Sequence, residues 1–200
     1  MTSASPSRHS PVFNLPNQLT ASRFVLAIVL FLLIERAQWL ACLGVFALAA
    51  LTDWLDGYLA RKQGITSTLG RNLDPLVDKV LVCGAYIFLI PYGAQEGWME
   101  PWMVTLVVAR ELVITSLRSF LENQGATFGA DWLGKIKMVL QCAALIAIFS
   151  AMIARDSFPE HARWVGQVRD VSVYGMLAAT LLSGLQYLWR AFTLYRAQPS

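Results

Sequence analysis

The stretch LTDWLDGYLARKQGITSTLGRNLDPLVDKVL, residues 51–81, carries four aspartates where two apolar runs meet. Asp53 and Asp56 are three residues apart, and Asp74 and Asp78 are four residues apart. This spacing predicts two helices, each with its pair of carboxylates on one face. Because a short connection makes the two helices antiparallel neighbours, the four carboxylates can converge on one small volume at the joined ends.

The composition places this hairpin in a membrane. The 200 residues are 56% hydrophobic and 14% charged, with a mean hydropathy of +0.50. A chain this apolar and this poor in charge is not an ordinary soluble domain, so the bilayer is its expected solvent. A spanning helix needs roughly 20 mostly apolar residues, and the length therefore allows about six of them.

Six apolar stretches predict an all-α integral membrane fold of six transmembrane helices with an N-terminal juxtamembrane segment. The stretches are residues 19–34, 39–55, 76–90, 102–121, 133–154 and 171–189. Several are shorter than a bilayer is thick, so their polar ends must belong to the helices and face protein or water. We expect residues 1–13 to form a flexible tail without a signal peptide, and residues 14–196 to form one membrane domain.

The distribution of Lys and Arg predicts the orientation. Basic residues gather on the side that holds the N-terminus, the second-to-third and fourth-to-fifth connections and the C-terminus, so that side is expected to be cytoplasmic. The third-to-fourth connection has two glutamates and no Lys or Arg. Arg155, Arg163 and Arg169 in the next outer connection break the pattern, and an interfacial helix containing Trp164 would account for them. The protein is thus expected to cross the inner membrane several times, with its active site facing the cytoplasm.

Charge and cysteines exclude other classes. The net charge is +3 and the pI about 8.9, but the basic residues are dispersed and form no stripe for nucleic acid. Attraction to anionic lipid headgroups explains them more simply. The three cysteines, Cys42, Cys83 and Cys142, are far apart in apolar runs, which predicts buried thiols and no disulfide or metal framework.

Four carboxylates beside hydrocarbon repel one another, so the aspartate cluster needs a cationic partner. Ligation by oxygen alone favours Mg²⁺, Mn²⁺ or Ca²⁺ over zinc, and such ions commonly hold phosphate oxygens. Transfer of a phosphoryl-type group is the chemistry that this arrangement favours. A single aspartate could instead be a salt-bridge partner or a snorkelling helix-end residue. Lys79 is interpreted as a helix-end counter-ion.

The same aspartates carry a family resemblance. The chain from Asp53 to Asp78 follows the pattern D-x2-D-G-x2-A-R-x8-G-x3-D-x3-D. In this segment the chain resembles the CDP-alcohol phosphotransferases, because it matches every fixed position of their signature. Its fixed positions are Asp53, Asp56, Gly57, Ala60, Arg61, Gly70, Asp74 and Asp78. Eight fixed positions match by chance on the order of once in ten billion start points.

The resemblance implies a six-helix membrane enzyme, usually a homodimer, with its active site at the cytoplasmic face. It implies that Asp53, Asp56 and Asp74 hold two Mg²⁺ or Mn²⁺ ions with help from Asp78, which is also the general base. CDP-diacylglycerol would be the donor, with Gly57 and Ala60 leaving room for the nucleotide and Arg61 steadying the phosphates. Gly70 belongs to the same donor site. NLPNQLTASR, residues 14–23, resembles the family's entry segment, in which Asn17, Thr20 and Arg23 approach the nucleotide phosphates.

The acceptor is suggested by charges inside the fourth and fifth stretches. Arg110, Glu111 and Arg118 interrupt an apolar segment, where an arginine costs roughly 2.5 kcal/mol or more, so partners or a ligand are expected. Glu111 can pair with Arg110 or Arg118. Lys135 and Lys137 begin the next stretch and point to different sides of a helix, so that only one is expected to face the site. These cations favour an acceptor with its own phosphate.

The pattern R-E-x-x-x-S-x-x-R followed by G-K-x-K resembles the phosphatidylglycerophosphate synthase branch of the family, which uses sn-glycerol 3-phosphate. The serine here is Ser116, one place off that spacing. We therefore expect transfer of the phosphatidyl group from CDP-diacylglycerol to glycerol 3-phosphate, releasing CMP. The alternatives are a cardiolipin synthase or a phosphatidylinositol-phosphate synthase of the same family and, from another class, a small cation transporter.

Overall fold

The computed structural model describes residues 15–63, 68–123 and 132–197, and within these ranges every regular element is a helix. The elements are α1 (Leu15–Glu35), α2 (Trp39–Gln63), α3 (Thr68–Glu96), α4 (Pro101–Asn123), α5 (Trp132–Ser157) and α6 (Pro159–Ala197). For this part of the chain the all-α prediction is confirmed. The predicted flexible tail lies outside the described residues.

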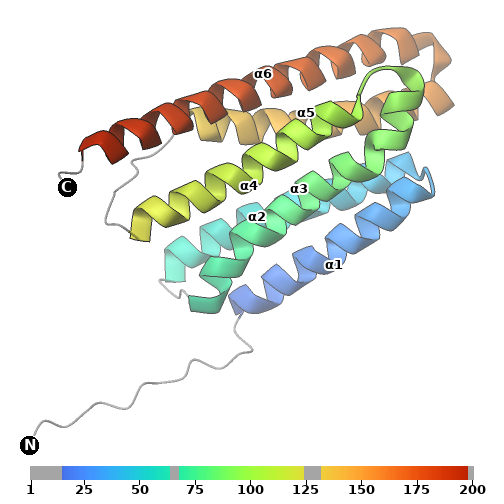
Figure 1. The fold of residues 1–200 in the computed structure, drawn as a ribbon. Helices are drawn as coiled ribbons and strands as arrows, with labels where there is room; N and C mark the ends of the chain where they lie inside the picture. The colour runs from blue at the N-terminus through green and yellow to red at the C-terminus, as the bar shows by residue number, and fades with distance from the viewer. Residues whose placement is uncertain (1–14, 64–67, 124–131, 198–200) are drawn as a thin grey trace, which may run out of the picture.

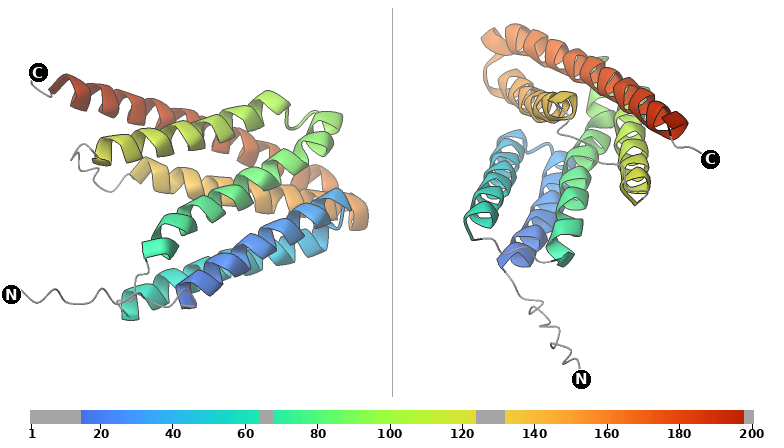
Figure 2. Two further views of the ribbon diagram at one scale, coloured as in Figure 1. Left: turned by 60° about the horizontal axis from the view of Figure 1, so that its bottom comes forward. Right: turned by 90° about the vertical axis from the view of Figure 1, so that its left-hand side faces the viewer.

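The helices run lengthwise beside one another, so that the molecule has two distinct ends (Figures 1 and 2). The turn end, as we call it, holds the short connections α1–α2, α3–α4 and α5–α6. The site end is the opposite one, where α1 begins, α2 ends and α3 begins, and where α6 finishes. The aspartate pairs therefore belong to the site end of α2 and α3.

Backbone geometry at the turn end explains why α1 and α3 stop where they do. Ala37 adopts a left-handed φ of 54°, and its N–H and that of Gln38 bond the carbonyls of Ile34 and Leu33, each at 2.9 Å. Gly97 does the same after α3, with a φ of 76° and a bond from the Trp98 N–H to the Gly93 carbonyl at 3.1 Å. Both ends are Schellman motifs, which satisfy carbonyls that the helix leaves unpaired.

The core and the surface are both apolar. Large side chains without exposed surface come from several helices, among them Leu30 of α1, Tyr86 of α3, Phe149 of α5 and Met176 of α6. Large apolar side chains also lie fully outside, including Leu40, Trp132, Val171 and Trp189, each more than 70% exposed. A soluble protein rarely exposes so much continuous apolar surface, and a lipid solvent removes the cost.

Within the residues that the structure describes, three helical segments are long and apolar enough to cross a bilayer, as judged by length and composition. They are Leu76–Glu96, Trp132–Ser157 and Pro159–Thr193, and a shorter apolar helix covers Trp39–Thr52. Arg110, Glu111 and Arg118 interrupt the apolar run of α4. The chain is an integral membrane protein, whereas six spans stay a prediction.

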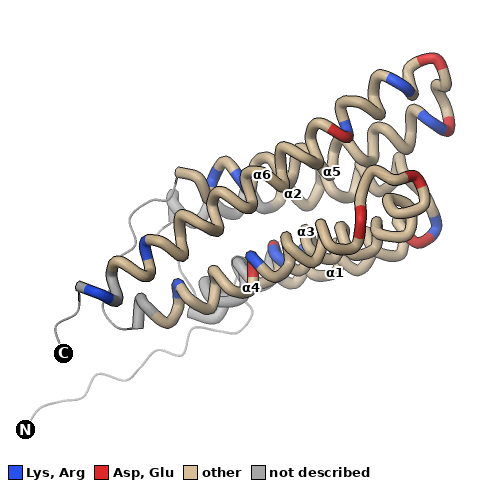
Figure 3. The backbone as a smooth tube through the Cα atoms, turned by 45° about the horizontal axis from the view of Figure 1, so that its top comes forward, with Lys and Arg blue, Asp and Glu red and all other residues tan. Residues whose placement is uncertain are grey.

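Two of the arginines that broke the charge pattern, Arg155 and Arg169, form ion pairs with one carboxylate at the turn end. Figure 3 shows Lys, Arg, Asp and Glu gathered at this end. Glu96 of α3 pairs with Arg155 of α5 and, at 3.3 Å, with Arg169 of α6. The Trp98 indole N–H also donates to Glu96 at 3.0 Å, and Arg169 lies 4.6 Å from the centre of the Trp98 ring. The segment containing Trp164 is not a separate interfacial helix, because α6 continues through it without a break.

Candidate active site

The backbone places the four aspartates toward the same end of α2 and α3, two helices that both pack against α1 in the described part of the chain. Asp53 and Asp56 lie in the last turns of α2, and Asp74 and Asp78 in the first turns of α3. The side chains of residues 53–75 are outside the described part of the chain, so the convergence of Asp53, Asp56 and Asp74 stays a prediction. The same holds for the predicted donor-binding residues Asn17, Thr20, Gly57, Ala60, Arg61 and Gly70. Among the described side chains, no three His, Cys, Asp or Glu residues lie together as a metal site.

Asp78 is described, and it contacts α1. The Arg23 guanidinium donates from Nη1 to Asp78 Oδ1 at 2.5 Å. The Arg23 side chain is 3% exposed and that of Asp78 is 28% exposed. A buried arginine thus orients a carboxylate that remains partly accessible. Sequence reasoning placed Arg23 at the donor phosphates and missed this contact with the predicted base.

A second charged cluster surrounds Glu111 inside the bundle. Glu111 Oε1 accepts from Arg110 Nη1 at 3.0 Å and also from Lys137 Nζ of α5. All three side chains are at most 11% exposed. Lys135 is exposed, so the two lysines face different surroundings, as the i, i+2 spacing requires. Glu111 therefore neutralises part of the buried positive charge of Arg110 and Lys137. Arg118, further along α4, is exposed.

Arg110 of α4 also contacts the last helix, α6, and the sequence did not suggest this contact. Arg110 Nη2 donates to Ser183 Oγ of α6 at 3.1 Å, and its guanidinium carbon lies 5.9 Å from the centre of the Tyr187 ring. Ser183 is fully buried and in turn donates to the Thr180 carbonyl at 3.1 Å. Ser183 and Tyr187 are four residues apart on one face of α6, a spacing that could have indicated a shared partner.

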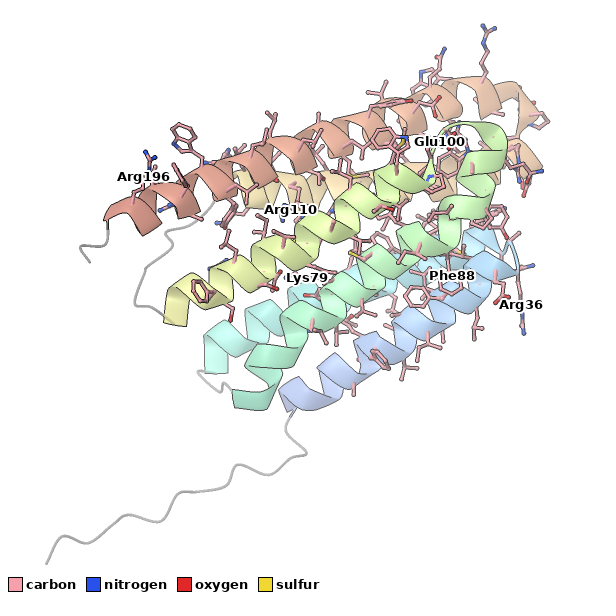
Figure 4. The ribbon with its side chains drawn as sticks, in the orientation of Figure 1. Arg36, Lys79, Phe88, Glu100, Arg110 and Arg196 are labelled. Carbon is pink, nitrogen blue, oxygen red and sulfur yellow. The ribbon has the colours of Figure 1, made fainter. Side chains whose placement is uncertain are left out.

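Lys79 reaches from the helix of the aspartates to the helix of the Glu111 cluster (Figure 4). Its Nζ donates to the Thr115 hydroxyl, which itself donates to the Glu111 carbonyl at 2.6 Å. Sequence reasoning looked for a serine and singled out Ser116, which is exposed on α4. The hydroxyl that joins the cluster belongs to the preceding residue, Thr115, four residues after Glu111. A pattern that allows threonine at the serine position would have identified it.

The Glu111 cluster has more donors than acceptors. Among the described side chains, Arg110 and Lys137 share the single carboxylate of Glu111, and Lys79 bonds the hydroxyl of Thr115, which itself bonds the Glu111 carbonyl. Within the part of the chain that the structure describes, Arg110 Nε is also buried without a hydrogen-bond partner. Buried donors without acceptors are costly, so this arrangement is suited to an anionic ligand.

Comparison with known proteins decides the family. The family model described as CDP-alcohol phosphatidyltransferase matches residues 13–182, which is most of the chain. The chain belongs to this family. The resemblance inferred from the aspartate pattern is thereby confirmed, and the chain is a CDP-alcohol phosphatidyltransferase, an enzyme of phospholipid biosynthesis.

Two curated relatives agree over nearly the full length. A protein of Bacillus subtilis (strain 168), named CDP-diacylglycerol–glycerol-3-phosphate 3-phosphatidyltransferase, is 33% identical over 201 residues, covering 90% of this chain and 97% of that protein. A protein of the same name from Escherichia coli (strain K12) is 32% identical over 182 residues, covering 88% of this chain and 93% of its own.

Solved structures share the fold. The apo crystal structure of Mycobacterium tuberculosis phosphatidylinositol phosphate synthase matches with a TM-score of 0.66 and 19% identity, covering 91% of each chain. The same enzyme in complex with manganese and citrate matches with a TM-score of 0.62 and 18% identity, covering 91% of this chain and 84% of that one. At this identity the likeness establishes the architecture and not the acceptor.

Proposed function

We propose that this phosphatidyltransferase uses sn-glycerol 3-phosphate as its acceptor. It transfers the phosphatidyl group from CDP-diacylglycerol and releases phosphatidylglycerol phosphate and CMP. The observation that carries the acceptor assignment is the donor-rich cluster around Glu111, where Arg110 and Lys137 pair with one carboxylate and Lys79 bonds the nearby Thr115 hydroxyl. A phosphate dianion supplies the negative charge and the strong acceptors that this cluster lacks, whereas a neutral alcohol supplies no charge. The names of the two curated relatives support the same acceptor.

Asp78 is the general base in this proposal. It accepts the proton of the acceptor's free primary hydroxyl, and the oxygen attacks the phosphorus that bears the diacylglycerol group. The new P–O bond forms as the bond to CMP breaks, and CMP leaves as the anion. Arg23 holds the Asp78 carboxylate at 2.5 Å, which fixes its direction relative to the incoming hydroxyl.

The metal ions are proposed to lie between α2 and α3. A donor set made only of carboxylates, Asp53, Asp56, Asp74 and Asp78, fits a hard divalent ion such as Mg²⁺ or Mn²⁺. Two ions held there would neutralise the pyrophosphate of the donor and stabilise its leaving oxygen. The nucleotide would be held by Asn17, Thr20, Gly57, Ala60, Arg61 and Gly70. The acceptor phosphate would be held by Arg110, Arg118, Lys135 and Lys137.

The proposed setting is the inner membrane, crossed by all six helices, with the site end at the cytoplasmic face and the protein forming a homodimer. The position of Arg61, Lys62 and Arg71 in the α2–α3 hairpin supports this orientation. CDP-diacylglycerol would then enter from the lipid with its acyl chains still in the bilayer, while the water-soluble acceptor arrives from the cytoplasm.

The experiment is CMP release from CDP-diacylglycerol by purified protein, with and without Mg²⁺ and glycerol 3-phosphate, with mass spectrometry of the lipid product. The proposal expects CMP release only when both are present. Asp78→Asn is expected to abolish release while the protein stays folded and binds metal. Undiminished turnover in that variant would remove Asp78 as the base.

A panel of acceptors separates the remaining functions. Turnover with phosphatidylglycerol would indicate a cardiolipin synthase, and turnover with inositol phosphate would indicate a phosphatidylinositol-phosphate synthase. Divalent-ion flux into liposomes without CMP production would indicate a cation transporter.

A further inference from the structure

We propose that Lys79 binds the phosphate of the acceptor and makes the enzyme selective for phosphorylated acceptors, with Thr115 holding the Lys79 ammonium in place when no acceptor is bound. The inference rests on the proposed function, because it names a recognition residue for that acceptor. The sequence did not suggest Lys79 as one of the residues that bind the acceptor. It was interpreted there as a helix-end counter-ion.

The other buried cations of the cluster are already engaged. Lys137 Nζ is bound to Glu111, and Arg110 uses Nη1 for Glu111 and Nη2 for Ser183. Lys79, in contrast, donates to a neutral hydroxyl in the described part of the chain. An ammonium group has three donors and keeps its full charge beside a hydroxyl, so Lys79 can bind a phosphate without breaking an ion pair.

The Lys79 ammonium lies next in the chain to the proposed base, Asp78, and on the side of α3 that faces α4. Asp78 and Lys79 are consecutive on α3, so their side chains point in directions about 100° apart. Asp78 contacts Arg23 of α1, whereas Lys79 contacts Thr115 of α4. An acceptor whose phosphate lies on Lys79 therefore has its carbon chain beside the helix that carries the proposed base.

The burial of Lys79 strengthens the preference for an anion. Lys79 is half-buried, and its partner among the described side chains is the neutral hydroxyl of Thr115. An ammonium group that is partly removed from water is stabilised by an opposite charge, which a phosphate supplies. A neutral hydroxyl compound supplies no such charge, which gives Lys79 a direct role in selectivity.

The test is steady-state kinetics on the full chain in detergent micelles, varying glycerol 3-phosphate and CDP-diacylglycerol separately. Lys79→Met is expected to raise the KM for glycerol 3-phosphate about 10- to 100-fold, the range of a charge-assisted hydrogen bond, and to leave the KM for CDP-diacylglycerol within about twofold. Lys79→Arg keeps the charge and is expected to retain most of the acceptor affinity. Thr115→Val is expected to raise the acceptor KM a few-fold.

Ser116→Ala is the matched control, because it removes the adjacent exposed hydroxyl and is expected to change neither KM. An unchanged acceptor KM in Lys79→Met, or an equal rise in both KM values, would overturn the inference. Should Lys79→Met fail to fold, Lys79→Gln and Lys79→Arg give the same comparison of charge removed against charge kept.

The outcomes also separate this inference from the proposed function. If the wild-type enzyme prefers another phosphorylated acceptor, the proposed acceptor is wrong, and the same KM comparison with that compound still decides the role of Lys79. If it prefers an acceptor without a phosphate, the role of Lys79 is wrong as well.

Discussion

At the scale of single residues, the contact between Arg23 and Asp78 ties the start of the chain to the proposed base. Arg23 is buried to 3% exposure, which makes it more suitable for orienting Asp78 than for reaching a large nucleotide ligand. Its loss would remove the hydrogen bond that α1 supplies to the Asp78 carboxylate. The two possible roles of Arg23 therefore have different kinetic consequences.

Arg23→Gln is expected to lower kcat about 10- to 100-fold, part of what a positioned general base contributes, with little change in the KM for CDP-diacylglycerol. Initial rates of CMP release at varied donor concentration measure both constants. If Arg23 instead binds the donor phosphates, the KM for CDP-diacylglycerol would rise and kcat would be retained.

Arg110 illustrates how a charged residue is kept inside the bundle. Three features of its guanidinium are used, since Nη1 donates to Glu111, Nη2 donates to Ser183, and the Tyr187 ring lies 5.9 Å away. Gly184 lies beside the stem of Arg110, where an added Cβ would make an ordinary van der Waals contact with Arg110 Cγ at 3.5 Å.

Ser183→Ala is expected to destabilise the protein by about 1–3 kcal/mol, since it leaves a second buried donor of Arg110 without an acceptor. Thermal unfolding in detergent measures the loss. Gly184→Ala is the neighbouring control and is expected to be neutral or slightly stabilising, because the added methyl group makes only ordinary van der Waals contact. Equal stability of Ser183→Ala and the wild type would show that Ser183 does not hold Arg110.

The sequence predicted which kinds of residue form the Glu111 cluster better than it predicted which of them contact one another. The excess of cations in the fourth and fifth stretches indicated a buried charged cluster, and Glu111 does pair with Arg110. Which lysine joins it depends on the rotation of α5, and only the three-dimensional packing selects Lys137 over Lys135. Hydropathy did not indicate the contribution of Ser183, because it does not show which face of α6 meets α4.

At the scale of helices, close packing of α1 on α3 depends on a glycine. A Cβ on Gly84 would lie 2.2 Å from Phe31 Cζ, and the Phe31 ring stacks on Phe88 with its centre 5.0 Å away. Since α1 carries Arg23 and α3 carries Asp78, this packing sets the distance across which the two residues meet.

Gly84→Ala is expected to destabilise the protein by about 1–3 kcal/mol, because the Phe31 ring must leave its place between the helices. Unfolding in detergent, followed by circular dichroism, measures the change. Gly44→Ala in α2 is the matched control, since nothing lies within 4 Å of its added Cβ and alanine favours a helix. A Gly84→Ala protein as stable as the Gly44→Ala protein would contradict this account of the α1–α3 contact.

Helix positions could be predicted from hydropathy, and helix ends could not. The fifth apolar stretch, 133–154, lies within α5, Trp132–Ser157, whereas the sixth, 171–189, is only the middle of α6, Pro159–Ala197. Hydropathy reports the apolar part of a helix, and α6 begins earlier because Pro159 suits the first helical position and the charged turns that follow still form backbone hydrogen bonds. The same reason explains why α4 is a continuous helix through Arg110 and Glu111.

At the scale of the whole molecule, the charged groups divide between the two ends and one interior cluster (Figure 3). At the turn end, Glu96 joins α3 to α5 and α6 through Arg155 and Arg169. In the interior, Glu111 joins α4 to α5. The aspartates occupy the opposite end from Glu96, so these ion pairs between helices lie apart from the proposed site of the chemistry.

The central claim is that α2 and α3 supply carboxylates to one shared metal centre. The measurement that tests it most directly is binding of Mn²⁺ to the full-length protein in detergent, followed by electron paramagnetic resonance, for the wild type, Asp56→Asn of α2 and Asp74→Asn of α3. We predict that either substitution alone weakens Mn²⁺ binding by about tenfold or more, since each removes a ligand of the same ions. Loss of binding from one helix's variant with unchanged binding in the other would contradict the claim.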